Sequence, residues 1–179
     1  MRDNLGQCSS QHPAYQQLDA KLPTRLIDIN PGNDTFRIVE TQDGSAGRYV
    51  ALSYCWGSSK FSTLTTDNTM LDWTSLSSIP KSIVDAVLIT KALGLRYLWV
   101  DALCIIQDSA EDWATQSAKM ESVYRNAYMT IAASSASSAN EGFLGQFPIL
   151  KSRTVQFPWR NHHGQQTILN MRRSPEHSW

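Results

Sequence analysis

The sequence predicts a three-layer α/β fold with a doubly wound, mostly parallel sheet and added β-hairpins at both ends. Three observations support this prediction: uncharged runs that suit buried strands, helical periodicity between those runs, and paired strand patterns near each end of the chain. A chain of 179 residues can form one hydrophobic core but is short for two ordinary domains. We expect a flexible tail at 1–21 and a single domain at 22–179, with its core at 47–145.

The first predicted element is a short hairpin. Leu26–Ile29 and Phe36–Val39 read as strands, and they flank Asn30–Asp34, a cluster of turn-forming residues. We expect this hairpin to lie at an edge of the main sheet.

The core begins with Tyr49–Tyr54, an uncharged run that suits a strand buried on both faces. Helical periodicity follows from Pro80 to Leu93, with Pro80 suited to the first turn and Gly94 to the exit. Tyr97–Val100 is a second apolar run and the second predicted strand.

A second helix is predicted from an N-cap at Ser109, with acidic residues in its first turn. Its core-facing residues are expected at helical spacing. They are Trp113, Met120, Val123, Tyr124 and Ala127, with the small Ser117 on the same face.

The third predicted strand is Tyr128–Ala133. The resulting order of strand, helix, strand, helix, strand favours parallel strands joined by right-handed crossovers. Beyond Gly145, Thr154–Phe157 and Thr167–Met171 flank Asn161–Gly164 and predict a second hairpin, in the region 150–172.

Composition excludes several classes of protein. Sixteen basic residues balance sixteen acidic ones, so nothing indicates binding to nucleic acid. No stretch approaches the roughly 18 apolar residues of a membrane span, and the N-terminus has no signal-peptide pattern, so we expect a cytoplasmic protein. Three cysteines without a CxxC pattern predict neither a disulfide framework nor a metal site.

Ligands of open parallel sheets bind outside the carboxyl ends of the strands, so these ends carry the candidate site. After the first strand, Ser53 and Tyr54 can donate hydrogen bonds, and Trp56, followed by Gly57, can stack on a flat ligand. Alternatively, Trp56 packs over the rim of the core.

After the second strand come Asp101, Cys104 and Gln107. A carboxylate such as Asp101 at the tip of a buried strand is a candidate catalytic group, or else a cap of the following turn. Cys104 is a candidate ligand contact or a reduced structural thiol, since no histidine lies in the core segments.

Glu141 follows the third strand among small residues. Its carboxylate can stabilise positive charge on a ribose during glycosidic cleavage, or it is simply solvated. The patterns GxGxxG, GxxxxGK, HExxH and GxSxG are absent, so no cofactor is predicted.

Three stretches resemble the heterokaryon-incompatibility (HET) domain of filamentous fungi. They are Tyr49–Gly57, Ile79–Ala86 and Leu98–Gln107, supported by Asp112-Trp113, Met120, Tyr124–Ala127, Thr130–Ala133 and the lead-in Leu22–Leu26. The resemblance implies a role in nonself recognition and programmed death of fused fungal cells.

The HET domain has been compared with Toll/interleukin-1 receptor (TIR) domains, which implies a flavodoxin/TIR-like arrangement. Ala51–Tyr54 is similar to the first strand motif of TIR domains, and Asp101 sits where their second strand ends. Some TIR domains cleave NAD with a Glu after the third strand, so the resemblance implies Glu141 as the catalytic residue, NAD as substrate and no bound cofactor.

Two other readings stay open at this point. One is an interaction module without turnover, which self-associates or recruits other incompatibility proteins. The other is an enzyme of small-molecule biosynthesis.

Overall fold

The structure is a computed structural model, and it describes residues 19–144, 154–160 and 166–172. The chain divides into two compact units, Met1–Phe143 and Leu144–Trp179. The boundary falls at the end of the predicted core. Each unit is described by itself.

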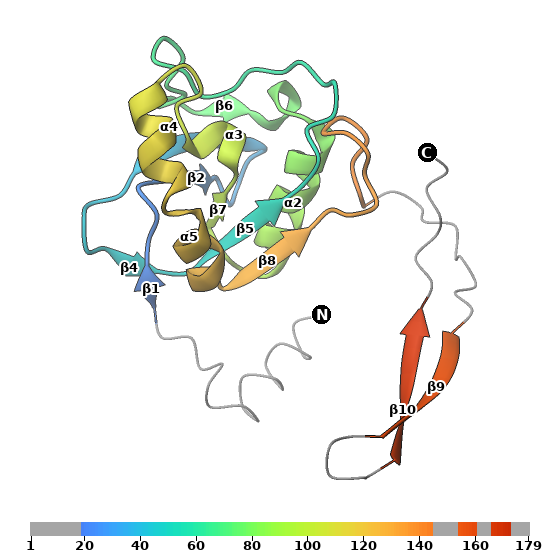
Figure 1. The fold of residues 1–179 in the computed structure, drawn as a ribbon. Helices are drawn as coiled ribbons and strands as arrows, with labels where there is room; N and C mark the ends of the chain where they lie inside the picture. Colours follow the sequence, from blue (N-terminus) through green and yellow to red (C-terminus); the bar gives the residue numbers. More distant parts are fainter. Residues whose placement is uncertain (1–18, 145–153, 161–165, 173–179) are drawn as a thin grey trace. The chain divides into compact units, whose positions relative to one another are not determined.

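The first unit contains a six-stranded mixed sheet in the order β6-β3-β2-β7-β5-β8 (Figure 1). Its strands are β2 Arg25–Ile29, β3 Thr35–Glu40, β5 Tyr49–Ser53, β6 Thr74–Ser75, β7 Tyr97–Trp99 and β8 Met129–Ala132. β5 pairs in parallel with β7 on one side and with the edge strand β8 on the other, as the sequence predicts. The remaining pairings are antiparallel, so the prediction of a mostly parallel sheet is wrong.

The antiparallel part of the sheet comes from the predicted N-terminal hairpin, which is confirmed as β2 and β3. Its turn is closed by Asn30, whose backbone N–H donates to Thr35 O at 3.0 Å and whose Oδ1 accepts from the Gly32 N–H at 3.0 Å. β2 also pairs with β7, so the hairpin continues the main sheet. All five residues of β2 are buried, whereas burial alternates along β3.

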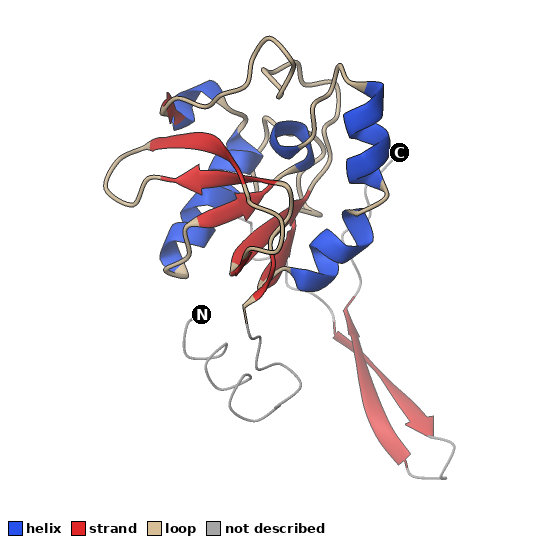
Figure 2. Cartoon of the chain, turned by 90° about the vertical axis from the view of Figure 1, so that its left-hand side faces the viewer, coloured by secondary structure: helices blue, strands red, loops and turns tan. Residues whose placement is uncertain are grey.

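Helices occupy both sides of the sheet (Figures 1 and 2). The described helices are the 3-10 turn η2 Leu76–Ser78, α2 Lys81–Ala92, α3 Asp101–Cys104, α4 Ala110–Ser117 and α5 Met120–Asn126. α2 connects β5 to β7, and α3 to α5 connect β7 to β8. Pro80 precedes the first turn of α2, and Gly94, with φ +76°, follows its last turn, as the sequence predicts.

The second predicted helix is confirmed at its start and wrong in its continuity. Ser109 Oγ accepts from the Asp112 N–H at 3.2 Å, the predicted N-cap. The helix then breaks between α4 and α5, where Ser117 Oγ donates to Ala114 O at 3.2 Å and the Lys119 N–H closes a tighter turn. The break takes Trp113 out of register with the core face, and its side chain is 55% exposed, so its predicted burial is wrong.

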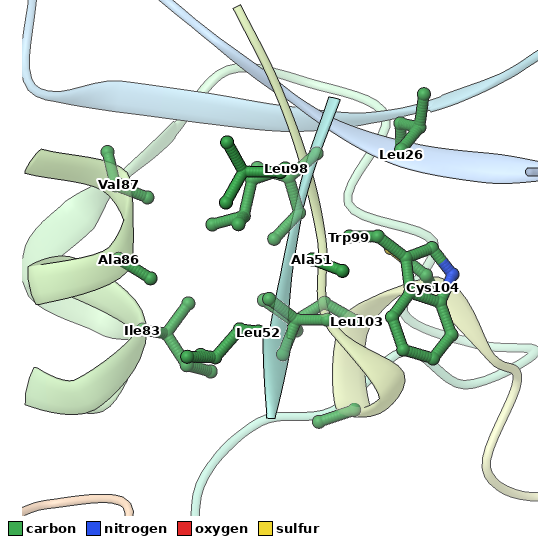
Figure 3. Close-up of a cluster of buried hydrophobic side chains, with 14 of the residues drawn as sticks. Leu26, Ala51, Leu52, Ile83, Ala86, Val87, Leu98, Trp99, Leu103 and Cys104 are labelled. Carbon is green, nitrogen blue, oxygen red and sulfur yellow. The ribbon is translucent and has the colours of Figure 1, made fainter. Parts of the chain in front are cut away.

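The core consists of side chains from both faces of β5 and β7. Figure 3 shows Ile83, Ala86 and Val87 of α2 facing the strands, with Trp99 on the far side of β5 from this helix. Val123 and Ala127, at the α5 end of the predicted core face, are buried there. Trp99 meets the ring of Tyr124 of α5 edge-on, at 5.6 Å between centroids.

Smaller elements complete the description. β1 Ala20–Lys21 pairs with β4 Ala46–Gly47, so the last residues of the predicted tail are a short strand, while 1–18 lie outside the described residues. In the second unit, β9 Thr154–Arg160 and β10 Gln166–Arg172 form the predicted C-terminal hairpin. In the described part of the chain, no helix combines the length and apolarity needed to cross a membrane.

Candidate functional site

The carboxyl ends of the parallel strands β5 and β8 border a pocket of about 290 Å³. Its lining consists mainly of small side chains from the ends of these strands and the loops that follow. The lining residues are Ser53, Tyr54, Cys55, Ala132, Ala133, Ser134 and Ala136. Of the predicted site residues, Ser53 and Tyr54 therefore line a pocket together.

Trp56 is held by its own chain on several sides. Its ring stacks near Tyr54 at 6.4 Å between centroids and meets Phe61 at 5.7 Å. Its indole Nε1–H donates to Asp101 Oδ2 at 3.0 Å. The ends of the first and second strands therefore share a hydrogen bond, and Trp56 is held as the packing alternative describes.

Asp101 is the first residue of α3, directly after β7. Its Oδ1 accepts from the Ala102 N–H at 2.7 Å, so it caps the turn, as the second reading of this residue predicts. Burial raises the pKa of Asp101, although the hydrogen bonds from Ala102 and Trp56 oppose this shift. The side chain of Asp101 therefore holds the turn and the Trp56 indole in place, and its carboxyl group has a raised pKa.

The hydroxyl of Tyr54 is buried and has no hydrogen-bond partner, the only such side-chain atom among the described residues. Burial raises the pKa of Tyr54, and the nearby Asp101 carboxylate adds to this effect. Buried polar groups nearly always have a partner, so the unsatisfied hydroxyl of Tyr54, a residue of the pocket lining, is an exception in this part of the structure.

Gln107 and Cys104 support α3. The Gln107 amide donates to Asp101 O at 3.0 Å and to Ile105 O at 2.9 Å, so it holds both ends of the turn. Cys104 is 1% exposed in the core, and burial raises the pKa of its thiol to about 12. A thiol with this pKa carries almost no thiolate at neutral pH.

Gly57 allows the loop after β8 to approach closely. Its φ is +60°, and a side chain here would lie 2.7 Å from Ser138 Cβ and 3.0 Å from Ser137 O. The Ala139 N–H donates to Trp56 O at 3.3 Å, and Ala139 O accepts from the Ser82 N–H at 2.9 Å. The loop thus joins the end of β5 to the first turn of α2.

Glu141 lies in this loop and is exposed. Its Oε2 accepts from the N–H of Ser137 at 2.7 Å and from the hydroxyl of Ser137 at 2.9 Å. Ser137 follows Ala136, which lines the pocket. The Glu141 carboxylate therefore contacts a residue that is adjacent in sequence to the pocket lining, and neither Glu141 nor Asp101 belongs to the lining itself.

The sequence analysis missed two groups of ion pairs with buried members and a larger hollow. Arg25, 7% exposed, pairs with Asp112 at 2.6 Å, and Asp28, 1% exposed, pairs with Arg96 and Arg37. A hollow of about 510 Å³ lies at the amino end of β5, lined partly by residues of the lead-in before β2. The signals in the sequence that point to such pairs are Asp28, a charged residue inside the predicted strand, and Arg25 directly before that strand.

A comparison with family models gives one clear result. The model of "Heterokaryon incompatibility protein (HET)" matches residues 49–178, which is most of the chain. Searches of curated proteins and of solved structures find no match. The matched range includes β5 and β8, whose carboxyl ends border the candidate site, together with α2 and β7. The chain belongs to the heterokaryon incompatibility (HET) family.

Proposed function

We propose that this HET-family protein is a cell-death effector of heterokaryon incompatibility that binds a nucleotide at the carboxyl ends of β5 and β8 and cleaves NAD there. The observation that carries this proposal is the position of the pocket. After β5 the chain crosses to β7 on one side of β5, and after β7 it crosses back to β8 on the other side of β5. The switch point of the parallel strands therefore lies between β5 and β8. Open α/β sheets bind their ligands at such points.

The order of the parallel strands supports a flavodoxin/TIR-like arrangement. Counted along the chain, β5, β7 and β8 are the first, second and third parallel strands, and they lie in the order second, first, third. In flavodoxin-like sheets with this order, the ligand lies between the first and third strands. The pocket of about 290 Å³ suits one nucleoside-sized part of a dinucleotide, since it is at the lower end of usual ligand pockets.

The proposed reaction transfers the ribosyl C1′ of NAD from the nicotinamide nitrogen to water. The C1′–N bond breaks with its electron pair on nicotinamide, water forms the new C1′–O bond, and one proton is released. Positive charge develops on the ribose, and a nearby carboxylate stabilises it. Glu141 is the candidate for this role because Ser137 holds its carboxylate next to the pocket lining.

Asp101 is assigned a positioning role. Its carboxylate accepts hydrogen bonds from the Trp56 indole and from the Ala102 N–H in α3. It therefore fixes the position of Trp56 beside Tyr54, which lines the pocket. Ser53, exposed at the end of β5, is the candidate hydrogen-bond donor to the ligand.

The test is to incubate the purified chain at high concentration with NAD and to follow nicotinamide release by chromatography. Glu141→Gln keeps the shape of the side chain, and we expect it to lower the rate by roughly 100-fold or more. Glu121→Gln is the matched control, because Glu121 is an exposed carboxylate paired with Arg125 on α5. No nicotinamide release by the wild type at any concentration would exclude NAD cleavage.

A second candidate function is a self-associating interaction module without turnover. The observation that favours it is a hollow of about 510 Å³ beside α2, where the 46%-exposed Leu88 lies with Leu76, Ile79 and Val84. Sedimentation of the wild type and of Leu88→Asp over a concentration series tests this reading. Association that the variant lacks supports the module, and a monomer at all concentrations opposes it.

A further inference from the structure

The hollow at the amino end of β5 lies at the end of the strand opposite to the pocket described above. Its volume is about 510 Å³, within the range of ligand sites. Its walls come from the lead-in before β2, the segment after β3, the end of α4 and one face of α5. The lining residues are Lys21, Leu22, Pro23, Thr24, Thr41, Gln42, Asp43, Tyr49, Gln116, Lys119, Ser122, Val123 and Asn126.

The floor of this hollow is built from buried groups. Tyr49 is completely buried, and its hydroxyl donates to Val123 O at 2.5 Å. Val123 is 6% exposed, and Leu22 packs against the same core. Strand and helix are thus tied together beneath the hollow, which gives it an apolar and rigid base.

The break between α4 and α5 shapes the polar wall. Gln116, 9% exposed, lies in α4, and Lys119 directly precedes α5. Both side chains line the hollow. Gln116 donates to Asp112 Oδ1 at 3.5 Å, so the Arg25 to Asp112 pair stands behind this wall and fixes it.

The charged groups of the lining favour an anion. Lys21 pairs with Asp43 at 2.8 Å, and both are largely exposed. Lys119 is also exposed and forms no ion pair within the described residues. Two lysines against one aspartate leave a net positive charge beside amide and hydroxyl side chains.

We propose that this hollow is a second binding site, for a small organic anion that joins an apolar ring to a carboxylate. The ring lies against Leu22 and the exposed part of Val123, above the buried Tyr49, and the carboxylate reaches Lys119. Thr24, Asn126 and Gln116 provide hydrogen bonds around it. The site stands independently of NAD cleavage, because it shares no lining residue with the pocket between β5 and β8.

The test uses 2-naphthoate as the probe and the uncharged 2-naphthamide as its partner, titrated calorimetrically into the full chain. We expect saturable binding of naphthoate in the low millimolar range or tighter. Lys119→Met should weaken naphthoate binding roughly two- to five-fold and leave naphthamide unchanged, as expected for one exposed charge contact. Lys60→Met, which removes an exposed lysine outside this lining, should change neither.

A second variant fills the hollow. Ser122 is exposed on α5, so Ser122→Trp should fold normally and weaken both probes about ten-fold or more. An unchanged melting temperature of this variant checks its folding. The proposal is overturned if naphthoate does not bind the wild type saturably, or if Lys119→Met and a folded Ser122→Trp both bind it as well as the wild type.

Discussion

Removal of the guanidinium of Arg25 is expected to destabilise the protein strongly. Arg25 donates to both carboxylate oxygens of Asp112, at 2.9 and 2.6 Å, and to Cys104 O at 3.0 Å. The side chains of Arg25 and Asp112 are only 8% and 13% exposed. Arg25→Met retains most of the apolar stem but leaves the carboxylate with the Ile106 N–H and Gln116 as its remaining donors.

The magnitude follows from the burial of this pair. Loss of one partner of a buried ion pair costs about 3–5 kcal/mol, because the remaining charge stays desolvated. For a chain of 179 residues this corresponds to a fall in melting temperature of roughly 6–20 °C. The matched control is Arg37→Met, because Asp28 keeps both hydrogen bonds from Arg96 when Arg37 is lost.

The assay is thermal and urea unfolding of both variants, followed by circular dichroism. We expect the large loss for Arg25→Met and less than about 1 kcal/mol for Arg37→Met. The double variant with Asp112→Leu should recover much of the loss, since no buried charge then remains unpaired. Equal, small losses for the two arginine variants would refute this account of the pair.

Three further predictions concern the same unit. Burial opposes ionisation of Asp112, but the pKa of Asp112 is lowered below its ordinary 3.8, chiefly by the hydrogen bond from the Arg25 side chain. The ionised carboxylate therefore stabilises the fold fully above about pH 4, and this contribution is lost as the pH falls further. Measurement of the unfolding free energy during an acid titration checks this. Gly142→Ala should lower the free energy of unfolding by about 1–3 kcal/mol more than Gly44→Ala. Both glycines have positive φ, but a Cβ at Gly142 would lie 2.6 Å from Lys81 Cγ, whereas a Cβ at Gly44 would meet no atom within 4 Å. Chemical denaturation measures the difference. Trp113→Ala should leave the melting temperature nearly unchanged, whereas Trp99→Ala, 3% exposed in the wild type, should cost about 3–5 kcal/mol in thermal unfolding.

Local signals in the sequence predicted most individual elements. The uncharged run at Tyr49–Ser53, the Ser109 cap and the turn formers after Ile29 each specify structure through neighbours in the chain. The break after Ser117 was missed because neither glycine nor proline marks it. The burial of Trp113 was predicted wrongly for the same reason, since its register with Met120 assumes one continuous helix.

Non-local relations explain the other differences. Nothing near β2 in the sequence indicates that it pairs with β7 as well as with β3, so the mixed character of the sheet could not be predicted. For the site, the common edge of parallel strands led to Trp56 and Asp101 as separate candidates, and the hydrogen bond between them is a contact that the sequence did not predict. The support that Asp101 and Gln107 give to α3 could not be predicted, because α3 has only four residues and is too short to show helical periodicity in the sequence.

The parallel pairing of β5 also bears on how this protein folds during synthesis. Val50 pairs with Leu98 on one side and with Met129 on the other, the latter on the order of 80 residues later in the chain. At about 5–20 residues per second, β5 emerges from the ribosome several seconds before its last partner. The edge of β5 that pairs with β8 therefore lacks its partner strand during this interval, and its backbone N–H and C=O groups are open to incorrect pairing.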